Sequence, residues 1–518
     1  MILDHLGKPM PKPTEKARAA SRGVLQASVD AGLNIPELSG HFRHADTLGP
    51  NTSLTKDVRQ SIRSKARMER SQNSYLTGIL QTLSNFIIGT GPKLQMQIVG
   101  EDGTPDRELN TDIEQEFGKW AKHVGLAEKL RTAVATRKLD GEAFISIVRN
   151  PRARKHTGYG LSLQLFEADQ VQVESIYHNG GTNDGGDGIT YDKYGNALKY
   201  PVLRQHPGET NAFDGAGSII QWIPEDYMCH LYRVDRPGQK RGVSEILAAL
   251  PLFAMLRRMT LATVTNMEKA ANITGVLESD AEVDEFGNSL SNVMEEDWMS
   301  ELPTGRNTLL TLPGGMKVKE FQGANPNTEY SLFQKSIIRE IARCLSIPLN
   351  VAAGDSSDMN YSSGRLDYQT FAAANAVERS YIEANCLDII LGQWLKLYYA
   401  SEFGMDPDTV DTYNLNHTWM WVGLDDVDQA KATLAADREL RYGGTSRGAI
   451  LAEKGIDIDV HDAKAAEELG YDSVQEYRKS IALYLHGEPK DEGQAEVDES
   501  VTEAKPNNLP ENNLLDKD

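Results

Sequence analysis

Cysteine is scarce in this chain of 518 residues: Cys229, Cys344 and Cys386 stand far apart and match no metal or redox spacing. The pattern argues against a disulfide framework and suits a reducing compartment. No apolar run in the sequence approaches the roughly 18 residues that span a bilayer, and the N-terminal stretch lacks the apolar segment of a signal peptide. We therefore expect a soluble protein that is made in the cytoplasm.

The sequence also lacks the short motifs that hold phosphates or activate a serine. Neither Gly-x-x-x-x-Gly-Lys-Ser/Thr nor Gly-x-Ser-x-Gly occurs, which argues against a Walker-type ATPase and against a serine hydrolase of the nucleophile-elbow type. Gly354-Asp-Ser-Ser357 is similar to a nucleophile segment, but no histidine stands near it, and a flexible loop explains it better. We therefore expect no enzymatic activity and no cofactor.

Two candidate metal sites fail on their spacing. His41 and His44 would share one helical face, but no third ligand stands nearby. The run Asp280-x-Glu282-x-Asp284 imitates the start of a calcium loop, yet a glutamate follows it where the sharp turn needs glycine. The sequence therefore predicts no bound metal.

Positive charge is in short supply, since 54 lysines and arginines face 75 aspartates and glutamates, for a net charge of −21. Such a surface repels nucleic acid, so any contact with DNA must be local or brief. The segment 487–518 has ten acidic and three basic residues, which predicts an acidic disordered tail.

Two long amphipathic helices are the strongest patterns that are present. From Val243 to Asn272, apolar residues recur at spacings of three and four, as one buried helix face requires. Pro251 lies inside this pattern, where it removes a backbone donor and clashes with the preceding turn, so we expect a kink. The second pattern, Thr328 to Ile347, has one apolar row, formed by Phe333, Ile337, Ile341 and Leu345.

The second helix also carries a basic row. Lys335, Arg339 and Arg343 are spaced by four and lie about 200° around the helix axis from the apolar row. One interpretation is a solvated face with ion pairs to Glu329 and Glu340. In a ring of many copies, the row would instead become a charged annulus that touches a phosphate backbone without reading sequence.

A polar loop follows this helix, which Pro348 should end. An apolar-periodic helix then resumes through Phe371, Ile382 and Trp394. The residues of the loop that we single out are Gly354, Asp355, Ser356, Ser357, Asp358, Met359, Asn360, Tyr361, Ser362, Ser363 and Gly364.

The front of the chain has the pattern of an α+β domain. Residues 1–50 predict an extended arm, and residues 54–88 predict one long helix. Further helices are expected at 111–124 and 126–139, and strands at 143–149 and 161–166, while residues 222–234 close this domain. Asp192-Lys-Tyr-Gly-Asn196 suits the turn of a hairpin.

The insert between the two long helices and the C-terminal part complete the pattern. Residues 273–325 predict a small α/β knob with a strand, a helix and two further strands. Residues 419–422 predict a strand, and residues 425–485 predict short helices broken by glycines.

The order of these elements is informative. An arm and an α+β body precede Arg241-Gly-Val-Ser-Glu245, which opens a long helix, and a knob follows it. The next helix ends in Arg339-Glu-Ile-Ala-Arg-Cys-Leu-Ser-Ile-Pro348, and Tyr361-Ser-Ser-Gly-Arg365 opens another. Together, over roughly residues 50–485, these features resemble tailed-bacteriophage portal proteins of the lambda type.

The resemblance implies a ring of about twelve α+β multidomain subunits. It assigns 1–50 to an arm, 51–240 and 399–425 to a wing, 241–272 and 326–347 to a helical stem, 273–325 to a small α/β clip, 348–364 to a tunnel loop, 365–398 to a tunnel helix, and 426–486 to a helical crown.

The resemblance also implies a role and partners. The ring would stand at one capsid vertex of the virion, after assembly in the host cytoplasm, and pass double-stranded DNA during packaging and ejection. Its partners would be the large terminase, the major capsid and scaffolding proteins, and head-completion or adaptor proteins, with no membrane. The basic row of Lys335, Arg339 and Arg343 would line the channel and touch DNA. We expect the clip to dock the terminase or adaptor through Glu285, Glu295, Glu296, Trp298 and Arg306.

Two alternatives remain at this point. One is another virion ring protein, either an adaptor or a capsid subunit, which differs from a portal in subunit size and ring mass. The other is a soluble multidomain enzyme with an unrecognised site, which predicts a monomer or small oligomer with paired titratable groups in a pocket.

Overall fold

The computed structural model describes residues 47–100, 103–153, 159–171, 188–209, 220–272, 276–279, 316–319, 327–357, 359–410, 415–423 and 429–486. The chain divides into two compact units. Unit 1 comprises the described parts of Met1–Ile88 and Lys119–Asn414, and unit 2 those of Gly89–Gly118 and Leu415–Asp518. The boundaries differ from the predicted ones, because residues 89–118 of the predicted wing group with the C-terminal helices.

Unit 1 begins with α2 (Pro50–Ser53), α3 (Lys56–Gln72) and α4 (Ser74–Ile88). The prediction of one continuous helix over 54–88 is wrong, because the chain breaks at Asn73. The side-chain oxygen of Asn73 accepts hydrogen bonds from the backbone N–H of Tyr75 at 3.0 Å and of Leu76 at 3.3 Å. These bonds satisfy donors that the first turn of α4 would otherwise leave unpaired, so Asn73 starts a new helix.

Two antiparallel sheets of three strands follow in unit 1. In the first, β2 (Glu142–Arg149) lies between β3 (Leu161–Phe166) and β7 (Met228–Tyr232). In the second, β5 (Ala197–Leu203) lies between β4 (Thr190–Tyr191) and β6 (Ile220–Pro224). The predicted hairpin is confirmed, since Asp192 accepts hydrogen bonds from the backbone of Tyr194 and Asn196 in the turn. In the segment 222–234, which closes the predicted front domain, a 3-10 turn, η4 (Glu225–Tyr227), separates β6 from β7.

The short helix α6 (Leu126–Asp140) leads directly into β2 through Gly141. This residue has φ +97°, and a Cβ there would lie 2.3 Å from the carbonyl carbon of Val243. A side chain would therefore both strain the backbone and separate β2 from the segment that precedes the first long helix.

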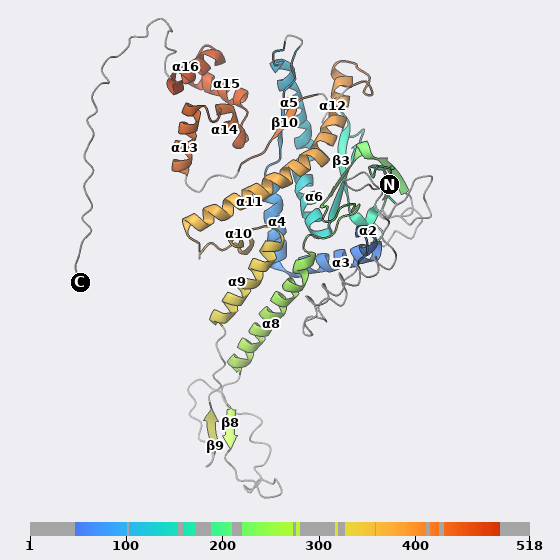
Figure 1. The fold of residues 1–518 in the computed structure, drawn as a ribbon, viewed down its shortest axis with the longest axis vertical. Helices are drawn as coiled ribbons and strands as arrows, with labels where there is room; N and C mark the ends of the chain where they lie inside the picture. Colours follow the sequence, from blue (N-terminus) through green and yellow to red (C-terminus); the bar gives the residue numbers. More distant parts are fainter. Residues whose placement is uncertain are drawn as a thin grey trace, which may run out of the picture. The chain divides into compact units, whose positions relative to one another are not determined.

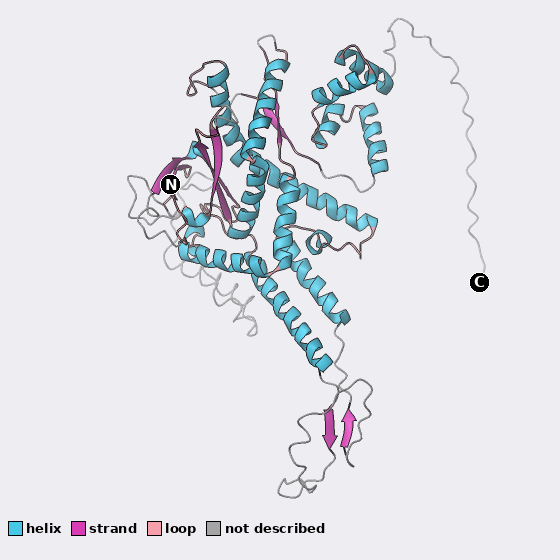
Figure 2. Cartoon of the chain, turned by 180° about the vertical axis from the view of Figure 1, so that it is seen from behind, coloured by secondary structure: helices cyan, strands magenta, loops and turns pink. Residues whose placement is uncertain are grey.

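The two predicted long helices are α8 (Leu250–Asn272) and α9 (Asn327–Cys344), which lie side by side (Figures 1 and 2). The prediction of a helix from Val243 with a kink at Pro251 is wrong. Residues Leu247–Ala249 form a 3-10 turn, η5, and α8 begins just before the proline. In the first turn of a helix, proline displaces no hydrogen bond, and its fixed φ suits the helix.

Among the described side chains of these helices, those near the start of α8 and near the end of α9 enter the core of unit 1. Phe253 and Leu256 of α8, Ile337 and Ile341 of α9, and Leu345 directly after α9 are buried in one cluster with residues of α4. Beyond them both helices carry exposed apolar side chains. Phe333, which the sequence places in the apolar row, is 47% exposed and so lies outside that core.

The segment Leu247–Glu268 is long and apolar enough to cross a membrane by length and composition alone, contrary to the expectation from the sequence. Only 17% of its most apolar window is buried in the structure. A single helix of this kind is weak evidence for a membrane. Its exposed apolar surface indicates that this helix contacts another molecule.

After α9 come α10 (Leu349–Ala353), α11 (Tyr361–Ile382), a π-helical turn η7 (Glu383–Leu387) and α12 (Asp388–Glu402). The predicted loop 348–364 is therefore too long. Its first part is a helix and its last residues open α11, so Gly354 to Asn360 is the true connection.

Two short strands, β8 (Val276–Ser279) and β9 (Met316–Lys319), pair antiparallel within the predicted clip. The rest of that segment, including Glu285, Glu295, Glu296, Trp298 and Arg306, lies outside the described residues. The same holds for Asp358, residues 1–46 and the acidic segment 487–518.

In unit 2, β1 (Lys93–Met96) pairs antiparallel with β10 (His417–Met420), and α5 (Arg107–Val124) starts in this unit. Four helices follow: α13 (Gln429–Tyr442), α14 (Arg447–Glu453), α15 (Ile458–Leu469) and α16 (Val474–His486). Buried Asp462 joins three of them, because its carboxylate lies 2.8 Å from Arg447 and 2.7 Å from Arg478. The expected α+β mixture of helices and sheets is confirmed.

Candidate functional site

The predicted basic row lies on α9, away from the buried apolar row. Arg339 and Arg343 are exposed and Lys335 is half-buried, while Ile337 and Ile341 on the same helix are buried. Among the described residues, no ion pair joins either arginine to Glu340. The side chain of Glu329, the other partner named for a solvated face, lies outside the described residues. The solvated face and the channel role of the row therefore both stay predictions.

A left-handed residue ends α9 and sets the direction of the next segment. Ser346 has φ +56°, and the N–H of Ile347 donates to the carbonyl of Ala342 at 3.0 Å, as in a Schellman motif. The chain thus turns back, and α10 packs on α9 and α4 in the core of unit 1. The helix ends before Pro348 because of this cap, not because of the proline.

The connection between α10 and α11 is organised by its own side chains. Gly354, at φ +66°, ends α10, and Asp355 accepts a hydrogen bond from Ser357 N–H at 2.9 Å. Asn360 caps α11 by accepting from the N–H of Ser363 at 2.9 Å. Met359 and Ser356 close the turn between these two caps.

The C-terminal half of α11 is anchored, whereas its N-terminal half is exposed. Arg379 donates to the carbonyls of Phe86 at 3.0 Å and Ile87 at 2.8 Å, at the end of α4. Phe371, the first buried residue among the described side chains of α11, meets Phe86 edge to face, with ring centroids 5.2 Å apart. The turns before Phe371, with Leu366 at 65% exposure, extend beyond this core.

A buried charge cluster connects α11 to the segment before α8. Lys138 Nζ lies 2.8 Å from Glu245 and 2.6 Å from Glu378 of α11, and Arg137 pairs with the same two carboxylates. Burial alone would raise the pKa of Glu378, but Lys138 and Arg137 outweigh it and lower that pKa. The cluster fixes α11 to the base of the long helices. The sequence analysis missed this cluster, whose only signal was the pair of adjacent cations Arg137 and Lys138 near the end of the predicted helix.

Glu167, Asp169 and His206 bring possible ligand atoms within 4.8 Å of one another, as a metal site would. The carboxylates already have cationic partners, because Arg67 lies 2.9 Å from each of them and Arg63 lies 2.8 Å from Asp169. Two guanidinium groups would repel a metal cation at this place. The residues present therefore do not fit a metal.

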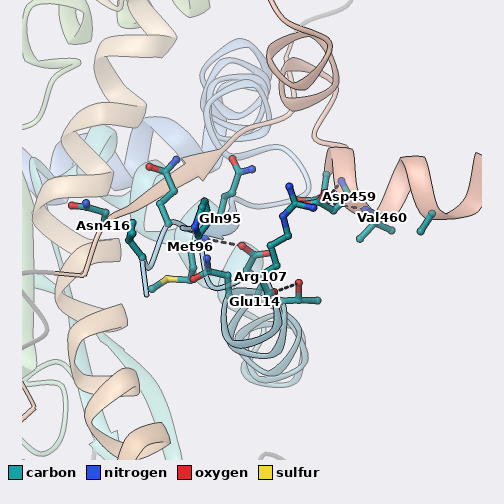
Figure 3. A pocket seen from close by; sticks show the side chains of 14 residues that line it. Gln95, Met96, Arg107, Glu114, Asn416, Asp459 and Val460 are labelled. Atoms are coloured by element: carbon teal, nitrogen blue, oxygen red, sulfur yellow. Dashed lines mark hydrogen bonds between the residues drawn. The ribbon is translucent and has the colours of Figure 1, made fainter. Parts of the chain in front are cut away.

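A pocket of about 640 Å³ lies within unit 2, between β1, α5 and α15 (Figure 3). Glu114 projects from α5 and accepts a hydrogen bond from Met96 N–H at 2.7 Å. Burial raises the pKa of Glu114 to about 7, the Met96 bond opposes the rise, and Asp457 and Asp459 add to it.

We expect Glu114→Gln to stabilise unit 2 at pH 8 by about 1 kcal/mol, after allowance for solvent screening. The folded-state pKa lies above the unfolded one, so the wild-type carboxyl group contributes stability that is lost as pH rises from about 4.5 through about 7. Glutamine keeps the Met96 acceptor without the charge. Thermal unfolding of both proteins at pH 4.5 and pH 8 measures the difference.

Asp112→Asn, which removes an exposed carboxylate from the same helix, is the control for the Glu114 variant. Asp112→Asn should leave the unfolding temperature unchanged at both pH 4.5 and pH 8. Equal stabilisation by Glu114→Gln at both pH values would contradict the raised pKa.

Comparison with known proteins identifies the family. Residues 42–379 match the family described as "Phage portal protein, lambda family", which is more than half of the chain. This chain belongs to the lambda family of phage portal proteins. The resemblance drawn from the sequence motifs is thereby confirmed, and membership in this family of structural proteins disfavours the enzyme alternative.

A curated relative of this portal-family chain is the "Probable portal protein" of Halomonas phage phiHAP-1. The two are 25% identical over 466 residues, which cover 86% of this chain and 88% of the relative. Among solved structures, the neck of an empty gene transfer agent particle is similar with a TM-score of 0.46 and 14% identity, over 79% of this chain and 94% of that one. An HK97-family portal protein from Corynebacterium diphtheriae is similar with a TM-score of 0.31 and 14% identity, over 67% and 98%.

Proposed function

We propose that this chain assembles into a closed ring of about twelve copies around a channel that passes double-stranded DNA. In this proposal the ring occupies one vertex of the phage capsid, where DNA enters during packaging and leaves during ejection. The subunit is made and assembled in the host cytoplasm and ends in the virion. Family membership supports this role, and one feature of the fold carries it further.

That feature is the apolar surface that a single copy leaves exposed on α8 and α9. Met255, Leu261 and Leu332 are 57%, 67% and 65% exposed, and Val264 and Met267 add to the surface of α8. Apolar patches of this kind on soluble proteins mark interaction sites. Neighbouring copies in a ring would bury these apolar side chains. Burial between subunits would explain why α8 is as apolar as a membrane-spanning helix.

In the proposed ring, the basic row would lie on the side of α9 that faces the channel. Each subunit would contribute Lys335, Arg339 and Arg343, which the ring repeats as charged annuli. These cations contact phosphates without sequence preference, while the net charge of −21 per subunit opposes lasting binding. Such a channel favours DNA that slides over DNA that stays bound.

The remaining partners follow from the family role. We propose that residues 273–325 dock the large terminase during packaging and later the adaptor or head-completion proteins. The terminase would supply the ATP chemistry, which agrees with the absence of a Walker-type loop from this sequence. The major capsid and scaffolding proteins would contact the outside of the ring.

Deletion of residues 356–359 tests whether the connection before α11 works at the channel constriction. The deletion leaves α10 and the cores of α9 and α11 untouched, so rings of unchanged mass should form. DNA packaging in a phage complemented with this variant should fall, because the constriction has lost its lining. Normal packaging by rings that carry the deletion would contradict the role of this loop.

A further inference from the structure

The three cations of the basic row differ in one respect. Lys335 Nζ lies 3.7 Å from Oδ2 of Asp355, with side-chain exposures of 33% and 45%, whereas Arg339 and Arg343 are exposed and face no such carboxylate among the described residues. The row therefore presents two uncompensated charges and one that has a counter-ion from its own chain.

Asp355 is held in place by the backbone around it. Its N–H donates to the carbonyl of Asn350 at 3.1 Å, and its Oδ1 accepts from Ser357 N–H at 2.9 Å. Asn350 belongs to α10, which packs on α9 and α4. The carboxylate is therefore presented from a segment fixed to the core, directly beside the helix that carries Lys335.

The carboxyl group is ionised at neutral pH. Hydrogen bonds from Ser357 lower the pKa of Asp355 first, and the charge of Lys335 lowers it further. An exposed pair of this length holds its partners weakly, so a competing anion can exchange with it. DNA phosphate is the anion that the proposed channel delivers to Lys335.

We propose that Asp355 is a built-in competitor for DNA: it pairs with Lys335 in the empty channel and gives that cation up when a phosphate passes. The inference rests on the proposed channel function. Each phosphate that binds Lys335 must displace a carboxylate that stays beside the site and recaptures the cation once the phosphate moves on. The exchange lowers the hold on DNA at this position and so favours sliding.

The test measures how purified rings bind a fluorescent double-stranded DNA over a series of NaCl concentrations. Asp355→Asn keeps the oxygen that accepts from Ser357 and removes the charge. We expect tighter binding at low salt, and a slope of log K against log salt that is steeper by about 0.9 for each additional phosphate that Lys335 engages.

Two further variants make the test specific. Asp367→Asn removes the same charge from α11, where the structure places no ion pair with Lys335, and should leave the slope unchanged. The double variant Lys335→Gln/Asp355→Asn should bind DNA with the same affinity and salt slope as Lys335→Gln alone, because without Lys335 there is no cation for which Asp355 and phosphate compete.

The outcomes separate this inference from the channel proposal. If Asp355→Asn changes the DNA affinity and the salt slope no more than Asp367→Asn does, Asp355 does not compete with DNA. The same conclusion follows if Asp355→Asn changes them equally in rings that carry Lys335→Gln. If Arg339→Gln rings bind DNA with wild-type affinity and slope, the basic row does not contact DNA, and the channel assignment itself fails.

Discussion

Glu142→Gln is expected to lose about 3–5 kcal/mol of folding free energy, since it breaks a buried ion pair and leaves one partner charged. Glu142 opens β2 and is fully buried, and Arg241 is 2% exposed. The arginine donates to both carboxylate oxygens, at 2.9 and 2.6 Å. With a neutral amide in place of the carboxylate, Arg241 would hold an uncompensated charge inside unit 1.

Two further contacts of the Glu142 carboxylate raise the expected loss of folding free energy. The N–H of Gly242 donates to the same carboxylate at 3.2 Å, and His230 lies 3.1 Å from it. Burial would raise the pKa of Glu142, but Arg241 and His230 outweigh it and hold that pKa well below its usual value. The group is therefore charged at neutral pH, and the loss of its charge affects β2, β7 and the segment before α8 together.

Chemical unfolding at matched protein concentration measures the effect, because assembly adds to apparent stability. Glu167→Gln is the control: its side chain is 50% exposed and pairs with Arg67 at 2.9 Å, so its loss should cost less than about 1 kcal/mol. A stability of Glu142→Gln equal to that of the control would show that the pair around Glu142 does not hold unit 1 together.

Arg339→Glu is expected to have the largest effect on function. In a ring the change turns one annulus of positive charge into a negative one, on a helix whose buried face it leaves alone. DNA binding by the rings should weaken, with a salt slope smaller by about 0.9 for each phosphate contact that is lost. Packaging into heads should fall with it.

Lys122→Glu is the matched control, because it reverses an exposed cation on α5, far from α9 in the sequence. Both variants should form rings of wild-type mass. If Arg339→Glu rings package DNA as the control does, the row on α9 lies outside the channel.

The local patterns of the sequence predict much of this fold. The apolar spacing over 328–347 places α9 within three residues at each end, and the Gly-Asn turn after Asp192 gives the hairpin. Where single residues override a pattern, prediction fails. Asn73 divides an apolar period that continues on both sides of it, and Pro251 starts a helix that the same period would begin earlier.

The buried charges could not be predicted from the sequence. Glu142 and Arg241 are 99 residues apart, and Lys138 and Glu378 are 240 residues apart, so no spacing rule connects them. Each looks like a surface residue until the fold brings it to its partner. The Lys335–Asp355 contact escapes prediction for a similar reason, because it depends on α10, which the sequence presents as loop.

The mass of the assembled particle tests the central claim most directly. Native mass spectrometry or analytical ultracentrifugation of the purified full chain, with a subunit mass of 57.2 kDa, gives the number of copies. Our account predicts a closed ring of about twelve subunits with a central opening in electron micrographs. A stable monomer or dimer at working concentrations, with α8 and α9 still exposed, would contradict it.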